Sequence, residues 1–166
     1  MEGYAEDFGI TTEGVELNID IIKKERPIQS KYVCIAVQST TQAKYWNHPG
    51  AWDELCRMLR KKDLTPVCID KDFSFGIPGH FNEAPSKAVK KNGLSLEDTI
   101  NYLYHCEMFI GLSSGLSWLA QGLKKPTVII SNVTSNDHEH IDERTLRIDV
   151  EVDDKQQTPR YCGITI

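Results

Sequence analysis

The sequence predicts an α/β fold, a Rossmann-like parallel sheet flanked by helices. Short apolar runs rich in β-branched residues, typical of strands buried on both faces, alternate with segments whose apolar residues recur at helical spacing. Such an alternation indicates right-handed βαβ units and therefore a parallel sheet. Ligands of these sheets bind beyond the carboxyl ends of the strands, so the function should lie in the loops that follow them.

Four buried strands and three helices account for the pattern. The strands are expected over residues 32–37, 64–69, 108–112 and 127–131. Pro49 is expected to open the first helix, Ser95 caps the second, and the third follows Ser113-Ser114-Gly115. Their apolar stripes comprise Trp52, Leu55, Cys56 and Leu59 in the first, Leu96, Ile100 and Leu103 in the second, and Leu116, Leu119, Ala120 and Leu123 in the third.

The remaining segments divide the chain. A short edge strand is expected within residues 146–152, where apolar and charged residues alternate, and residues 71–93 are expected to be irregular because Gly and Pro recur there. We interpret residues 1–30 as a leading linker, 31–153 as the α/β domain and 154–166 as a tail.

Length and charge exclude several classes of protein. The 166 residues are the size of one domain. The formal net charge of −5 argues against sequence-independent binding to nucleic acid and against attachment to an anionic membrane. No apolar run approaches the roughly 18–20 residues of a membrane span, and the acidic N-terminus lacks the apolar stretch of a secretory signal. We expect a cytoplasmic protein with no membrane span and no nucleic-acid partner.

The segment IGLSSGLSWLA, residues 110–120, gives the strongest local signal. A strand there runs straight into a helix, whose first N–H groups and partial positive charge attract anions. Gly115 would let a phosphate approach the backbone, and the Ser113 and Ser114 hydroxyls would add donors. The alternative is that one serine only caps the helix and Gly115 only allows close packing.

Two further loops supply candidate ligand-binding residues. QSTTQAKYWNHPG follows the first strand and contains Thr40, Gln42 and Lys44, of which Lys44 suits a diphosphate; the alternative is a solvated loop lysine. Its aromatic residues could stack on a base or pack the loop down. Asp70 ends the second strand, where an acidic residue holds a ribose hydroxyl in dinucleotide-binding folds.

Metal and nucleophile signatures are weak. The five cysteines form no CxxC pair and are expected to be buried free thiols. His138-Glu139-His140 could bind a metal, but its polar neighbours favour a solvated loop. Ser114 lies in SSGLS rather than GxSxG, which leaves a serine hydrolase as a remote third possibility.

Three blocks, SKYVCIAVQSTTQAKYWNHPGAWDEL, PVCIDK and FIGLSSGLSWLAQGLKKPTVIIS, resemble bacterial autotransporter heptosyltransferases in order and spacing. These are relatives of the ADP-heptose:lipopolysaccharide heptosyltransferases, and the resemblance covers roughly residues 30–135. It implies the C-terminal, donor-binding half of a GT-B enzyme, which has two Rossmann-like domains around a cleft.

The resemblance assigns roles to the candidate residues. Lys44 would bind the donor diphosphate and Asp70 would lie near the nucleoside. The residues that would form the phosphate-binding helix start are Ser113, Ser114, Gly115 and Leu116. The lipopolysaccharide enzymes have Asp at the position of Ser113 and His at that of Trp118, as expected for a different branch.

Two departures from the family matter. The N-terminal acceptor domain, which holds the family's catalytic acid/base, is not expected in these residues, so the catalytic residue is unknown. The family also ends in a cysteine-rich iron-binding finger; only Cys162 follows residue 106, so we assign no metal and no cofactor.

The resulting hypothesis is a glycosyltransferase domain that binds a nucleotide-diphosphate sugar, with ADP-heptose as the favoured donor. The sugar would be transferred to Ser or Thr of an autotransporter protein. The alternative is a non-catalytic nucleotide-sugar-binding module or a truncated remnant.

Overall fold

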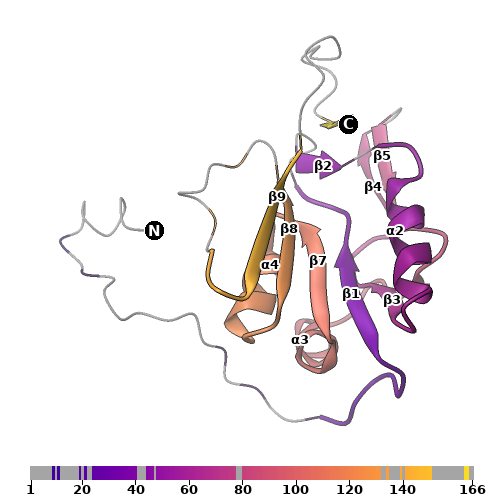
Figure 1. Ribbon diagram of the computed structural model, residues 1–166. Coiled ribbons are helices and arrows are strands. Elements are labelled where there is room, and N and C mark those ends of the chain that lie inside the picture. The colour runs from indigo at the N-terminus through magenta and orange to yellow at the C-terminus, as the bar shows by residue number, and fades with distance from the viewer. Residues whose placement is uncertain are drawn as a thin grey trace.

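The computed structural model (Figure 1) describes most of the α/β region and little of either end. The described residues are Gly9, Thr11, Ile19, Ile21, 24–40, 44–46, 48–77, 80–131, 134, 139, 141–150 and 163–164, without the side chains of 77, 80, 163 and 164.

These residues form a six-stranded sheet in which every neighbouring pair of strands is parallel. The strands, in spatial order, are β6 (Val89–Lys90), β3 (Thr65–Cys68), β1 (Tyr32–Ala36), β7 (Met108–Leu112), β8 (Thr127–Ser131) and β9 (Thr145–Asp149). The four buried strands expected from the sequence are all present. The expected edge strand is also present at β9, where it ends at Asp149.

Both faces of the sheet are covered, because alternate residues of β1 point to opposite sides. One set packs against α2 (Ala51–Arg60), and the other packs against α3 (Leu96–His105) and α4 (Gly115–Gly122). The first cluster includes Val33, Ile35, Trp52, Cys56 and Leu59, and the second includes Tyr32, Cys34, Tyr102, Leu103 and Ala120. The fold is therefore the three-layer α/β arrangement that the sequence predicts.

Two details of the expected helices are wrong. Pro49 does not open α2, which begins at Ala51 after Gly50, whose φ of 75° lies in the left-handed region that favours glycine. Leu96 is not part of the buried stripe of α3, since it is 65% exposed. It follows the capping residue Ser95, and the face that meets the sheet instead carries Thr99, Tyr102 and Leu103.

Residues 71–93 are more regular than expected. β4 (Ser74–Ile77) pairs with β5 (His80–Glu83) as an antiparallel hairpin, and β6 then joins the main sheet. The glycines and prolines of this segment predicted irregular structure. The structure instead has three short strands within it. The Asn82 side-chain amide of β5 donates a hydrogen bond to the carbonyl of Val37, so the hairpin supports the loop that follows β1.

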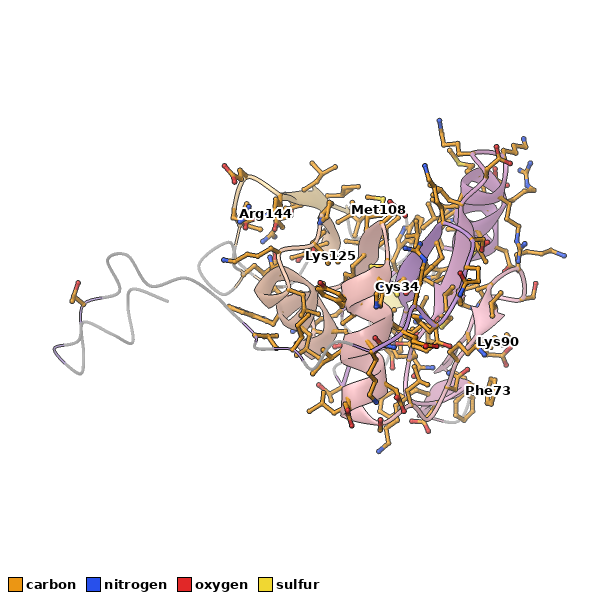
Figure 2. The ribbon with its side chains drawn as sticks, turned by 90° about the horizontal axis from the view of Figure 1, so that it is seen from below. Cys34, Phe73, Lys90, Met108, Lys125 and Arg144 are labelled. Carbon is orange, nitrogen blue, oxygen red and sulfur yellow. The ribbon has the colours of Figure 1, made fainter. Side chains whose placement is uncertain are left out.

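Four of the cysteines confirm the expectation of buried thiols: Cys34, Cys56, Cys68 and Cys106 are free and buried, while Cys162 lies outside the described residues. Burial raises the pKa of Cys34, which sits in the interior of the fold (Figure 2). No helix built from the described residues combines the length and the apolar composition needed to cross a membrane.

Candidate anion-binding site

A pocket of about 330 Å³ lies beyond the carboxyl ends of β1, β7 and β8. Its wall is made by the loop after β1, the start of α4 and the loop after β8. The lining residues are Ser39, Thr40, Lys44, Ser113, Ser114, Gly115, Trp118 and Thr134. Among the described residues, this lining contains one cationic side chain, several hydroxyls and no carboxylate, which is a chemistry suited to an anion.

The start of α4 forms one wall. Ser114 is the N-cap, in extended backbone conformation, and the Ser117 hydroxyl accepts a hydrogen bond from the Ser114 N–H and donates one to the Ser114 carbonyl. The Ser114 hydroxyl itself is shielded from water; it faces the Ser117 N–H in a capping box but forms no well-aligned hydrogen bond with any described residue. The helix therefore presents its positive end and an unsatisfied hydroxyl at the pocket.

Gly115 leaves space at this wall. A Cβ added there would meet no atom of the described residues within 4 Å, so packing among these residues does not require the glycine. This contradicts the alternative that Gly115 allows two elements to approach. A missing side chain at the first residue of a helix instead leaves the N–H groups open to a ligand.

Lys44 faces the helix start from the loop after β1. Its ammonium donates a hydrogen bond to the Ser113 carbonyl over 3.2 Å. The neighbouring Tyr45 belongs to β2 (Tyr45–Trp46), which pairs with β10 (Gly163–Ile164), and its hydroxyl donates to the Ser39 carbonyl over 3.1 Å. Tyr45 is 3% exposed, so it packs the loop down and is not available for stacking on a base.

Trp46 has the same anchoring role. Its carbonyl accepts a hydrogen bond from the Trp52 indole over 2.9 Å, and the two rings meet edge to face at 5.1 Å. The contacts of Tyr45 and Trp46, the two aromatic residues after Lys44, thus fix the loop against α2 and the sheet. Because the loop is fixed, Lys44 is held at the pocket.

Asp70 lies beneath the loop rather than in the pocket lining. Its carboxylate accepts hydrogen bonds from the N–H groups of Val37 and Gln38, and Cys68 donates a third through its thiol. Burial raises the pKa of Asp70, while these donors oppose the rise. At 2% exposure the carboxylate holds the turn out of β1, and a contact with a nucleoside stays a prediction.

The structure brings together five of the eight residues named as binding candidates: Thr40, Lys44, Ser113, Ser114 and Gly115. Gln42 lies outside the described residues. Leu116 packs against the core on the α3 side and does not line the pocket, which leaves only its backbone to meet a ligand.

Three lining residues were not among the binding candidates: Ser39, Trp118 and Thr134. Trp118 falls one helical turn after Ser114, and Thr134 follows the carboxyl end of β8. The rule that ligands bind at the carboxyl edge of the sheet would also have indicated Thr134. The interpretation of the polar residues around His138-Glu139-His140 as a solvated loop is wrong for Glu139, whose buried carboxylate pairs with Arg147 at 2.8 Å. His138 and His140 lie outside the described residues.

Other chemistries find little support in the described residues. They contain no group of three or more His, Cys, Asp or Glu side chains placed to hold a metal ion. A hydrolase nucleophile requires a neighbouring base, and no histidine among the described residues lines the pocket beside Ser114.

Fold and pocket together define a Rossmann-like nucleotide-binding domain with an anion site at its carboxyl edge. No protein-family model matches the chain. The autotransporter heptosyltransferase Aah of Escherichia coli is 43% identical over 119 residues, which are 71% of this chain and 30% of Aah. BimC of Burkholderia thailandensis, described as an inactive autotransporter heptosyltransferase, is 31% identical over 130 residues, 76% of this chain and 30% of BimC.

Solved structures agree. The dodecameric, iron-containing heptosyltransferase TibC, in complex with ADP-D-β-D-heptose, superposes with a TM-score of 0.76 at 37% identity, over 83% of this chain and 36% of TibC. The ADP-heptose lipopolysaccharide heptosyltransferase II of E. coli superposes with a TM-score of 0.60 at 14% identity, over 89% of this chain and 42% of that one, and shows the fold alone.

The chain is thus a homologue of the autotransporter heptosyltransferases, as its sequence blocks predict, and has the fold of a GT-B domain. It spans about 30% of the length of the curated relatives it matches.

Proposed function

We propose that this chain is the donor-binding, C-terminal domain of a heptosyltransferase-type glycosyltransferase. It binds a nucleotide-diphosphate sugar, with ADP-heptose as the preferred donor. One observation carries the proposal: Lys44 and the start of α4 face one pocket, in which the Ser114 hydroxyl has no partner among the described residues. The TibC complex with ADP-heptose, at 37% identity, supports the choice of donor.

The chemistry follows from the charge distribution. Transfer of the sugar displaces ADP from the anomeric carbon, so negative charge grows on the diphosphate in the transition state. A lysine and a helix N-terminus fixed beside that diphosphate stabilise this charge without having to reorganise. Lys44 and the N–H groups at Gly115 and Leu116 are the groups that this chain places for that task.

In our proposal, the groups that bind and activate the acceptor lie in another domain. We place the acceptor hydroxyl on Ser or Thr of an autotransporter protein in the cytoplasm. The base that deprotonates it would come from an acceptor-binding domain outside these 166 residues, because the lining of the described pocket includes no carboxylate and no histidine.

A second candidate is a nucleotide-sugar-binding module that transfers nothing. The absence of a carboxylate and a histidine among the described lining residues supports this candidate. BimC, a relative at 31% identity, is itself described as inactive. Both candidates bind the donor, so only a transfer assay separates them.

The test begins with ligand-induced thermal shifts of the purified chain. ADP-heptose and ADP should raise the melting temperature, since a ligand at 100 times its Kd stabilises by about 2.7 kcal/mol. UDP-glucose and GDP-mannose, at the same concentration, should shift it less. Equal shifts with all three nucleotides would contradict the choice of ADP, and no shift with any of them would refute the binding function.

A further inference from the structure

Thr134 contributes to the wall of the pocket from the segment that follows β8. It comes three residues after the end of β8 and lines the same pocket as Lys44 and Ser114. Its hydroxyl is shielded from water and, like that of Ser114, has no hydrogen-bond partner among the described residues. A buried hydroxyl left without a partner is unfavourable, and native structures rarely keep one without a reason.

A buried ion pair fixes the segment that contains Thr134. Arg147, on the edge strand β9, donates to the Thr134 carbonyl over 2.7 Å and pairs with the Glu139 carboxylate at 2.8 Å. The second oxygen of Glu139 accepts from the Ser131 hydroxyl at the end of β8, over 2.7 Å. The side chains of Arg147 and Glu139 are only 13% and 1% exposed.

Arg147 on β9 contacts two residues that follow β8, through the carboxylate of Glu139 and the carbonyl of Thr134. A guanidinium presents its donors in a fixed planar fork, so it fixes orientation as well as distance. Thr134 is thereby held in its place at the wall of the pocket.

We propose that Thr134 contacts the phosphate-containing ligand through its hydroxyl, and that Arg147 is a positioning residue that acts through Thr134. The inference rests on the proposed donor-binding function and adds a third contact region to the lysine and the helix start. The ligand oxygen supplies the partner that both hydroxyls, of Ser114 and Thr134, otherwise lack.

The test measures ADP affinity of the full chain by titration calorimetry. Thr134→Val removes the hydroxyl and keeps the shape, and it should weaken ADP binding about 3- to 10-fold, as expected for one hydrogen bond. Thr134→Ser keeps the hydroxyl and should bind like the parent. Thr65→Val is the matched control, since Thr65 begins β3 at the end of the sheet away from the pocket and its hydroxyl bonds only to the Ser30 hydroxyl among the described residues.

Arg147→Lys tests the positioning role, because it keeps a charge beside Glu139 but loses the planar fork. We expect it to weaken ADP binding to a similar extent. In the Thr134→Val background it should cause no further loss, whereas an unrelated structural role would give additive effects.

The outcomes are separable from those of the proposed function. If the parent fails to bind ADP, or if Lys44→Ala binds as tightly as the parent, the donor-binding function is refuted and this inference with it. If Lys44→Ala weakens binding while Thr134→Val matches the parent, only the role of Thr134 is overturned. Equal losses in Thr134→Val and Thr134→Ser would also overturn it, since the methyl group would then be responsible.

Discussion

The carboxylate of Asp70, at the end of β3, accepts a hydrogen bond from the backbone N–H of Val37 over 2.8 Å, just past the end of β1. Its other oxygen accepts from the next backbone N–H, at Gln38, over 3.1 Å. Two N–H groups that leave the β ladder are thus satisfied by one side chain from the neighbouring strand. The loop that carries Lys44 starts at these two hydrogen-bonded residues, Val37 and Gln38.

Asp70→Asn should destabilise the fold at neutral pH by about 1–3 kcal/mol. The asparagine amide can offer an oxygen to only one of the two N–H groups and must face the other with its own N–H. Urea denaturation measures the loss. Asp72→Asn, two residues on and exposed, is the matched control and should change the stability by less than about 0.5 kcal/mol.

The same variant tests the pKa of Asp70. Burial raises this pKa above its ordinary value of 3.8, so at a pH between the unfolded-state and the folded-state pKa the folded chain binds more protons than the unfolded chain. Its contribution to the free energy of unfolding is therefore full below pH 3.8 and is lost as the pH rises through the raised pKa. The stability of the parent relative to Asp70→Asn should increase as the solution is acidified. A difference that shrinks on acidification would show that the pKa is not raised.

Gly115→Ala should separate ligand binding from stability. The added methyl group meets no atom of the described structure, and alanine is the better helix former by up to about 1 kcal/mol, so the fold should be unharmed or slightly stabilised. Ligand affinity should fall, since the methyl group occupies the space in which a phosphate would approach the helix start. Thermal unfolding and ADP titration on the same sample give both results.

Gly111→Ala provides the contrast to that variant. A Cβ at Gly111 would lie 2.6 Å from the Phe109 ring and 2.9 Å from the Ala36 carbonyl oxygen, so this change should destabilise the sheet. If Gly115→Ala instead lowered stability and Gly111→Ala did not, the assignment of open space to Gly115 would be wrong.

The elements that could be predicted are those whose signal lies within one segment. The strand over Tyr32–Ala36 is a continuous apolar run, and the Ser114–Gly115 helix start follows directly from a strand, so both were found. Thr134 and Arg147 were missed because their roles depend on contacts between loop and edge strand that no local pattern encodes. Asp70 was placed at the right strand end, but the two backbone N–H groups that occupy its carboxylate belong to another strand.

Burial along α3 gives a stability prediction that corrects the expected stripe. Leu103→Ala should cost about 2–5 kcal/mol, because this side chain is fully buried in the cluster behind the sheet. Leu96→Ala, on the same helix but 65% exposed, should change the stability by less than about 0.5 kcal/mol. Comparable losses in the two variants, measured by urea denaturation, would contradict the orientation of α3.

The last prediction separates donor binding from sugar transfer. Lys44 offers a charge-assisted hydrogen bond worth roughly 1.5–3 kcal/mol, so Lys44→Ala should weaken the binding of ADP-heptose about 10- to 100-fold. The fold should be unaffected, because the lysine makes a single hydrogen bond, to the Ser113 carbonyl, among its described polar contacts. Transfer needs a base beside the acceptor hydroxyl, and the lining of the described pocket provides none. The purified chain should therefore bind ADP-heptose, with an affinity that calorimetry finds reduced in Lys44→Ala, yet leave an autotransporter passenger peptide unmodified by mass spectrometry. Heptose on the peptide after incubation with this chain alone would place a base within these 166 residues.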